Sequence, residues 1–230
     1  MNLKHISENG FTGNQLKLIA MISMTLDHIG LVLLPRWTIL RILGRLAMPV
    51  YAYMIAEGCR HTRSRKKYFL RIASLAALCQ GVYWFAMGSL YMSILVTFSL
   101  SVVLICAVDS YQQKRDRASR ILAVAALLGV FFLCVALPEL LPGTDYGIDY
   151  GIAGVLLPVL VYFGGEKTKY LTAGLILLGL GYGGVQWCAL AAVPLLGMYN
   201  GQRGTGRAGK WFYLYYPLHL LVIHGISLIL

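Results

Sequence analysis

Long apolar runs separated by short basic loops are the feature that most constrains this chain. Each run is about 17–22 residues, the length of a helix that crosses the hydrocarbon core of a bilayer. Hydrophobic residues make up 58% of the sequence and charged residues 13%, against roughly 45–50% and 25% in soluble domains. One soluble core cannot bury so much apolar surface. The sequence therefore predicts an all-α fold, a polytopic integral membrane helix bundle.

We predict about nine membrane-spanning helices, with eight or ten as alternatives, in a single domain over residues 1–230. The predicted helices are 15–34, 39–59, 68–87, 90–109, 119–138, 148–164, 170–181, 184–199 and 211–229. The stretch GYGG at 181–184 predicts a turn between the seventh and eighth. These two helices are short and rich in glycine, so one re-entrant hairpin is the alternative.

The basic residues predict the orientation of these helices. Sixteen of the 20 Lys and Arg residues lie within, or up to three positions beyond, five alternate loops. By the positive-inside rule these loops and the N-terminus are cytoplasmic, in a multi-pass protein of the cytoplasmic membrane. Topology then accounts for the net charge of +11, and we expect no nucleic-acid partner. The five cysteines are scattered singly without a CxxC pair, which argues against a bound metal.

The first apolar run contains polar residues that a membrane normally excludes. A charged side chain inside a bilayer is costly, so its presence there suggests a function. Lys17 and His28 are eleven positions apart, which puts both on one helix face, about 16 Å apart along the axis. We expect His28 near or just beyond the midplane. Asp27 is rotated by about 100° from His28 and is expected to face another helix.

The second predicted helix carries further charges. Arg41 and Arg45 are one turn apart on one face, and both are expected in the outer half of the membrane. Glu57 lies near the inner end, within reach of Arg60 or Arg71. Pairing between intramembrane Asp and Arg residues, which ties helices together, is the structural explanation for such charges.

The last predicted helix places a second histidine deep in the membrane. His219 is expected at a depth similar to that of His28. Tyr215 and Tyr216 precede it by about one turn and share its side of the helix. Packing alone is the structural alternative for each of these side chains.

Four motifs together point to a known family. They are MTLDHIG (24–30), GRLAMP (44–49), YNGQRG (199–204) and FYLYYPLHL (212–220). The sequence resembles the TraX family, named for the pilin acetylation protein of conjugative plasmids. The match is collinear over almost the whole chain, although residues 110–180 resemble the family only in hydropathy.

The TraX family is related to wider transmembrane acyltransferases, including the acyltransferase-3 group. In that group, a basic residue and a histidine separated by ten residues mark the first helix. Lys17 and His28 fit this spacing, with Lys in place of the more usual Arg. Lysine cannot make the bidentate phosphate contact that arginine makes.

The resemblance implies a membrane-embedded acetyltransferase that uses cytoplasmic acetyl-CoA as its acyl donor. The chemistry suits the intramembrane residues, because acyl transfer needs a base and donors for the tetrahedral oxyanion. We expect His28 to act as general base or as an acyl-carrying nucleophile, with Asp27 positioning it or balancing its charge. Arg45 or Tyr216 is the expected oxyanion donor, and His219 is a further catalytic candidate.

Coenzyme A adds phosphates that need cationic or polar ligands. The expected cofactor-binding residues are Lys17, Arg60, Arg63, Arg71, Asn200 and Arg203, and the substrate-binding candidates are Arg41 and Glu57. For the basic loop 60–71, the positive-inside rule alone is the structural alternative. Membrane lipids and an acceptor are the other expected partners. A pilin-like protein, a glycan and a lipid all remain open as the acceptor, as does O- or N-acetylation.

Two other classes of function fit a polytopic bundle with polar residues at its midplane. One is a small-molecule or lipid transporter or flippase; inverted symmetry between the two halves would favour it, and we find none. The other is a non-catalytic membrane partner in envelope assembly, for which substitution of His28 by alanine would be silent.

Overall fold

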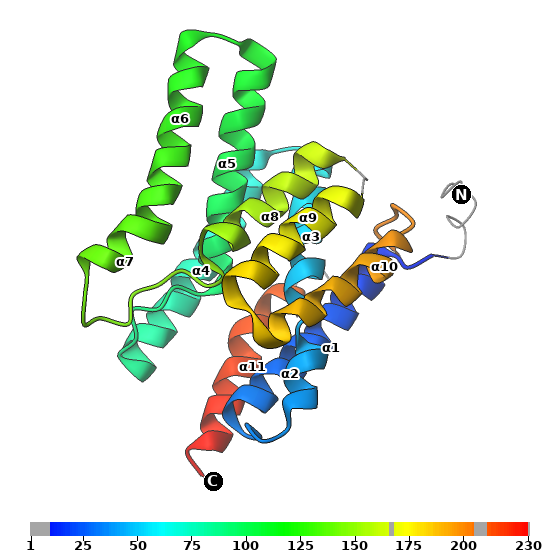
Figure 1. Ribbon diagram of the computed structural model, residues 1–230, viewed down its shortest axis with the longest axis vertical. Coiled ribbons are helices and arrows are strands. Elements are labelled where there is room, and N and C mark those ends of the chain that lie inside the picture. Colours follow the sequence, from blue (N-terminus) through cyan, green and yellow to red (C-terminus); the bar gives the residue numbers. More distant parts are fainter. Residues whose placement is uncertain (1–9, 166–167, 205–210, 230) are drawn as a thin grey trace. The chain divides into compact units, whose positions relative to one another are not determined.

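The computed structural model describes residues 10–165, 168–204 and 211–229. For residues 86–87 and 211–214 it describes the backbone alone. Within these ranges the chain is helical, with two isolated β-bridges between loops and no strand. It divides into two compact units (Figure 1). Unit 1 comprises Met1–Met54 and Lys167–Leu230, and unit 2 comprises Ile55–Glu166. The single domain expected from the sequence stays a prediction.

Unit 1 is built from both ends of the chain. Its helices are α1 (Gly13–Val32), α2 (Thr38–Gly44), the first part of α3 (Ala47–His61), α9 (Thr168–Tyr182), the 3-10 helix η3 (Gly184–Ala191), α10 (Ala192–Gly197) and α11 (Trp211–Ser227). Helix α1 packs against both α2 and α11, and η3 packs against α9 and α2. The first and last helices of the chain therefore lie side by side (Figure 1).

Unit 2 is built around the long helix α5. Besides the end of α3, its helices are α4 (Arg65–Met87), α5 (Ile94–Lys114), α6 (Arg117–Phe131), the π-helix η2 (Phe132–Ala136), α7 (Leu137–Leu140) and α8 (Gly151–Gly164). Helix α5 packs against α4, α6 and α8. Leu104, Val130 and Val155 form a buried apolar cluster where α5, α6 and α8 meet.

Four helical stretches in the described part of the chain are long and apolar enough to cross a membrane. They are Gly13–Val32, Thr38–His61, Ile94–Lys114 and Arg117–Leu140, with Gly151–Gly164 and Gly184–Gly197 as shorter apolar helices. This supports a membrane protein, but the predicted count of about nine spans is not confirmed. Helices α9 and α11 have 15 and 17 residues, and α4 begins with a basic segment, RKKYFLR.

The predicted continuous helix 39–59 is broken in the structure. Helix α2 ends at Gly44, and α3 begins at Ala47. Pro49 falls in the first turn of α3. Backbone amides in a first turn have no acceptor within their own helix, so the helix loses no hydrogen bond through the N–H group that proline lacks. The break places Arg45 at the junction between the two helices.

Two other predicted helices also depart from regular α-helix. The predicted helix 119–138 begins as α6 and continues as the π-helical η2, which ends just before Pro138. Proline has no backbone N–H group to donate to the preceding turn. The predicted 184–199 begins as the 3-10 helix η3. The turn predicted at GYGG is confirmed, because Gly183 and Gly184 have φ angles of 62° and 49°, which favour glycine.

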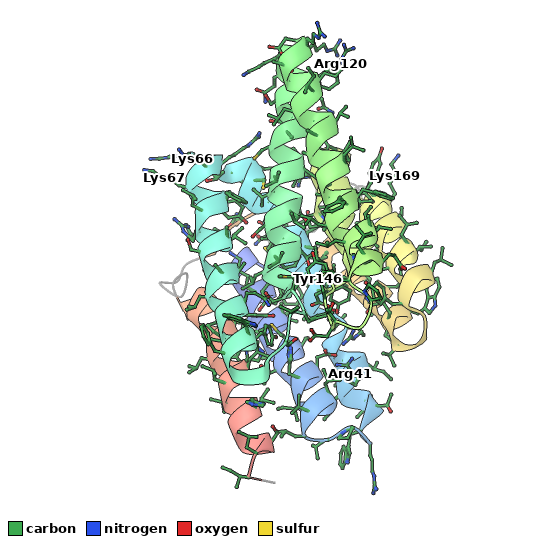
Figure 2. The ribbon with its side chains drawn as sticks, turned by 90° about the vertical axis from the view of Figure 1, so that its left-hand side faces the viewer. Arg41, Lys66, Lys67, Arg120, Tyr146 and Lys169 are labelled. Atoms are coloured by element: carbon green, nitrogen blue, oxygen red, sulfur yellow. The ribbon has the colours of Figure 1, made fainter. Side chains whose placement is uncertain are left out.

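The two ends of unit 2 differ in character. Lys66 and Lys67 at the start of α4 and Arg120 near the start of α6 extend from its basic end, away from Tyr146 (Figure 2). The two predicted cytoplasmic loops, 60–67 and 110–118, thus belong to the same end of unit 2. At the other end, a backbone bridge joins Met92 to Ile148.

Candidate functional site

Two histidines from opposite ends of the chain meet in unit 1. Nε2 of His219 on α11 lies 3.4 Å from Nδ1 of His28 on α1, and the two rings cross at 74° with centroids 5.0 Å apart. Nδ1 of His28 is also 2.8 Å from the carbonyl oxygen of Met24, and Nδ1 of His219 is 3.0 Å from that of Tyr215. A carbonyl only accepts hydrogen bonds, so we assign the ring proton to Nδ1 in both histidines. This assignment leaves Nε2 of His28 with a lone pair that can accept a proton.

Aromatic side chains of α11 fix the position of His219. The ring of Tyr215 stacks on His219 with an interplanar angle of 6° and centroids 5.3 Å apart. Tyr216 meets the same ring edge-on, 5.5 Å between centroids. The hydroxyl groups of Tyr215 and Thr25 are 2.5 Å apart, which ties α11 to α1. The predicted arrangement of both tyrosines around His219 is confirmed.

A charged cluster lies beside the histidine pair. Asp27 does face another helix, as expected: its carboxylate accepts from Arg41 Nη1 at 2.8 Å and from Arg45 Nη2. The backbone allows this close approach at Gly44, where an added Cβ would lie 2.4 Å from Cβ of Asp27. The close packing of α2 against Asp27 therefore explains the glycine at the first position of GRLAMP.

The charged cluster and the histidine pair belong to one site. The charges of Asp27, Arg41 and Arg45 all act on the imidazole of His28. Three of the other predicted catalytic residues, Asp27, Arg45 and His219, therefore lie with His28, and Tyr216 joins them through His219. Their catalytic roles remain predictions.

A glutamine that the sequence did not single out completes this cluster. Nη1 of Arg45 donates to Oε1 of Gln186 on η3 at 3.1 Å. Gln186 is only 3% exposed, and its Nε2 has no partner among the described residues. The sequence indicates this residue only weakly, as a single neutral amide in the apolar stretch GVQWCALA. A neutral amide suggests a functional site less strongly than a charged side chain does.

Three of the predicted cofactor ligands lie around the start of α1. The capping box of Thr12 and Gln15 begins the helix, and the carbonyl oxygens of Gln202 and Arg203 accept from its first amides at 2.8 and 3.0 Å. The segment YNGQRG is thereby held against α1.

This segment brings two cations near each other. The charge of Arg203 acts on Lys17, so the start of α1 carries a local positive field. Asn200 has a structural task, because its side chain donates to the Gly10 carbonyl at 3.2 Å and accepts from the Gln202 amide at 2.9 Å. The side chain of this predicted ligand is thus used in shaping the loop.

The remaining predicted ligands belong to unit 2. Arg60 donates to Glu57 at 2.6 Å and to the carbonyl oxygens of Val161 and Tyr162. These contacts tie α3 to α8, and they confirm the predicted proximity of Glu57 to Arg60. Their geometry favours a structural role for this pair.

Arg63 and Arg71 are exposed. Arg63 lies in the loop before α4, and Arg71 lies within α4. Neither lies in the unit that holds the histidine pair. The idea that they bind phosphate together with Lys17 stays a prediction.

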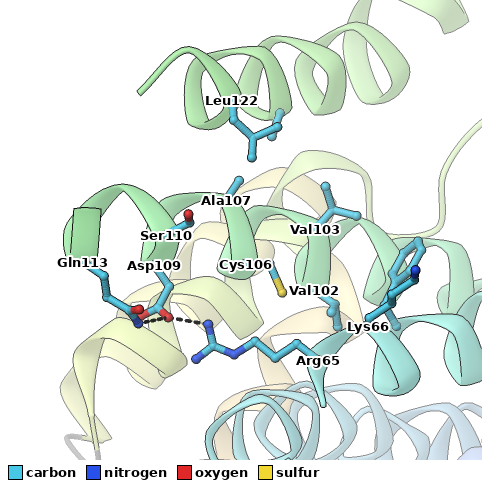
Figure 3. A pocket seen from close by; sticks show the side chains of 12 residues that line it. Arg65, Lys66, Val102, Val103, Cys106, Ala107, Asp109, Ser110, Gln113 and Leu122 are labelled. Atoms are coloured by element: carbon cyan, nitrogen blue, oxygen red, sulfur yellow. Dashed lines mark hydrogen bonds and ion pairs between the residues drawn. The ribbon is translucent and has the colours of Figure 1, made fainter. Parts of the chain in front are cut away.

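Unit 2 also contains a pocket of about 510 Å³ between α4, α5 and α6 (Figure 3). Its wall is mostly apolar, and its polar edge holds Arg65, which pairs with Asp109, and Gln113, which donates to Asp109 at 2.7 Å. No predicted site residue lines this pocket. Among the described residues, no group of three or more His, Cys, Asp or Glu side chains is arranged to hold a metal ion.

Comparison with known proteins identifies the family. The family model described as TraX protein matches residues 12–227, nearly the whole chain. The chain belongs to the TraX family. The curated relatives of this TraX-family chain include a probable fimbrial assembly protein of Dichelobacter nodosus, 27% identical over 96% of the chain and 97% of the relative. An uncharacterised protein of Rickettsia prowazekii (strain Madrid E) is 60% identical over 38 residues, 16% of the chain and 15% of that relative. No solved structure matches.

Proposed function

We propose that this TraX-family protein is an acetyltransferase of the cytoplasmic membrane, which moves an acetyl group from cytoplasmic acetyl-CoA to an acceptor at or across the membrane. The observation that carries the proposal is the His28–His219 pair beside the Asp27 charge cluster. An imidazole titrates near neutral pH, so it suits proton transfer. Charges buried within a membrane protein are expensive, and a catalytic site is a reason to keep them.

In the proposed reaction, His28 acts as the general base. Nε2 of His28 accepts the proton of an acceptor hydroxyl or amine, while that oxygen or nitrogen attacks the carbonyl carbon of the thioester. A tetrahedral oxyanion forms. When it collapses, the carbon–sulfur bond breaks, and the CoA sulfur takes the proton from His28. The products are the acetylated acceptor and free CoA thiol.

His219 has a supporting role in this scheme. Its Nε2 faces Nδ1 of His28 at 3.4 Å, where it accepts a hydrogen bond and favours the tautomer with a basic Nε2. Tyr215 and Tyr216 hold the His219 ring in place. Asp27 stabilises the imidazolium electrostatically while it remains paired with Arg41 and Arg45.

The cationic start of α1 suits the phosphates of CoA. Lys17 and Arg203 lie there, and α1 carries His28 eleven residues further on, about 16 Å along the axis. The extended pantetheine arm would bridge that distance. For the acceptor we favour a pilin-like subunit, since a relative of the full chain length is described as a probable fimbrial assembly protein.

Acetyl transfer by the purified protein in lipid nanodiscs tests this proposal. We expect wild-type protein to release CoA from acetyl-CoA carrying a labelled acetyl group, and His28→Ala to lose about 100-fold or more in rate while still binding acetyl-CoA. His224→Ala is the matched control, because it removes another histidine of α11. The variant keeps the backbone carbonyl that accepts from the Ser227 hydroxyl, and we expect it to keep the wild-type rate.

Two outcomes would contradict the proposal. Folded wild-type protein that neither binds nor turns over acetyl-CoA would exclude acetyl transfer, and transport assays would follow. An unchanged rate in His28→Ala would exclude His28 as the base or nucleophile.

A further inference from the structure

The amide of Gln186 is a buried hydrogen-bond donor with no acceptor. The side chain is 3% exposed, and Nε2 has no partner among the described residues. A buried polar group without a partner is costly and uncommon in folded proteins. Such a donor is expected to meet its partner when a ligand binds.

Arg45 determines which end of this amide is open. Its Nη1 donates to Oε1 of Gln186 at 3.1 Å, and a guanidinium has no lone pair to accept a bond from Nε2. Oε1 must therefore face Arg45, and the two N–H groups of Nε2 point elsewhere. Arg45 is itself held by Asp27 through Nη2 and by the Arg41 carbonyl through Nε.

The same contacts change the expected role of Arg45. Each of its three nitrogens already meets an acceptor within unit 1, namely Gln186, Asp27 and the carbonyl of Arg41. A guanidinium bound in this way is well suited to orienting a neighbour. Gln186 offers the N–H groups that Arg45 was expected to supply.

We propose that Gln186 is the oxyanion donor of the acyl transfer, positioned by Arg45 and Asp27. The inference rests on the proposed function. Nε2 of Gln186 donates a hydrogen bond to the acetyl carbonyl oxygen, and this bond strengthens as the oxygen gains negative charge. No proton is transferred to that oxygen. The neutral amide adds no second charge beside His28, on which the Arg45 charge already acts.

Two substitutions separate a donor from a structural link. Gln186→Glu keeps an oxygen for Arg45 but has no N–H group, whereas Gln186→Asn keeps an N–H donor one methylene shorter. We expect Gln186→Glu to lower kcat for acetyl transfer by about 100-fold or more, with little change in KM for acetyl-CoA. Gln186→Asn should retain more of the rate than Gln186→Glu.

Gln80→Leu is the matched control, because Gln80 in α4 also has a buried amide atom without a partner, its Oε1, and it belongs to unit 2. We expect its kcat to equal that of wild type. Thermal unfolding in nanodiscs checks that each variant is folded. As a second readout, the infrared carbonyl stretch of isotope-labelled acetyl-CoA should shift to lower frequency on wild-type protein and not on Gln186→Glu.

The outcomes distinguish this inference from the function on which it rests. Active wild-type protein with an equally active Gln186→Glu, or with no carbonyl shift, overturns the role of Gln186 alone. Wild-type protein without acetyl transfer overturns the proposed function, and the role of Gln186 with it.

Discussion

The two units of this chain are both helical, but they place their charges differently. In unit 1, Asp27 on α1 pairs with two arginines, Arg41 in the last turn of α2 and Arg45 just after it, and the Arg45 side chain is only 9% exposed. In unit 2, Arg65 and Asp109 pair where α4 begins and near the end of α5. The Arg65 side chain in unit 2 is 32% exposed, and a charge that keeps contact with water costs less than a buried one. The Asp27 cluster therefore carries the larger desolvation cost, and the proposed function rests on it.

The family motifs follow the same division. MTLDHIG, GRLAMP, YNGQRG and FYLYYPLHL all lie in unit 1, and they supply both histidines of the pair together with Asp27 and Arg45. Arg41 and Gln186 come from outside them. Much of the stretch that resembles the family only in hydropathy lies in unit 2.

Breaking the Asp27 cluster should have the largest effect on stability. Asp27→Ala leaves Arg41 and Arg45 without their carboxylate, and removing one partner of a buried ion pair costs about 3–5 kcal/mol. Asp109→Ala in unit 2 should cost only about 1 kcal/mol, because the side chain of its partner Arg65 is 32% exposed. Denaturant unfolding in detergent measures both, and equal losses would refute the contrast between the units.

Filling the close contact at Gly44 should have the next largest effect. The added methyl of Gly44→Ala would overlap rigid atoms of Asp27 at 2.4 Å, and overpacking of this kind costs about 1–3 kcal/mol. Gly129→Ala in α6 is the control, because no atom lies within 4 Å of its new Cβ. There alanine should stabilise the helix by up to about 1 kcal/mol. A neutral Gly44→Ala would mean that Asp27 is less constrained than described.

The hydroxyl contact between α1 and α11 should give a smaller effect. Thr25→Val and Tyr215→Phe each remove one side of the 2.5 Å contact, and a double-mutant cycle should yield a coupling energy of about 1 kcal/mol. In unit 2, Ser101→Ala removes a bond of 2.8 Å to the Val155 carbonyl. We expect only the unit 1 variants to lower acetyl transfer as well, because they alone loosen the His219 ring.

The smallest effect should be a local response to pH in unit 2. Hydrogen bonds from the Ser89 hydroxyl and the Leu90 amide hold the pKa of Asp145 below its ordinary value. These bonds are fully present above the ordinary carboxyl pKa, near 3.9, and are lost as pH falls through the lower folded value. Exchange of the Leu90 amide proton should therefore accelerate only in strong acid. Asp145→Ala removes the acceptor and should leave the Leu90 amide unprotected at every pH, and a protected amide in that variant would argue against the contact.

Much of the fold follows from local sequence, whereas the site depends on distant contacts. Hydropathy predicts the helices, and the spacing of Asp27 from His28 predicts that they face different neighbours. The break between Gly44 and Ala47 was missed, because the apolar run is continuous there, and the contact between Arg45 and Asp27 joins residues 18 positions apart. No periodicity relates His28 to His219, since the two are 191 positions apart.

Gln186 shows a different limit of sequence reasoning. A neutral amide within an apolar stretch is as compatible with packing as with function. Only its burial, its bond to Arg45 and its open Nε2 distinguish it. By contrast, the pairing of Glu57 with Arg60 is predictable, because the two are one helical turn apart.

The discontinuity of unit 1 has a consequence for biosynthesis. Translation delivers α1 and α2 first, then all of unit 2, and finally α11. The polar face of α1 must therefore wait in the translocon or the lipid, without His219 or Gln186, until more than a hundred further residues have been synthesised. A nascent chain that stalls before α11 lacks the second imidazole altogether. Under the proposed function, an incomplete product therefore holds the base but lacks the side chain that orients it, so full activity appears only when α11 has been inserted.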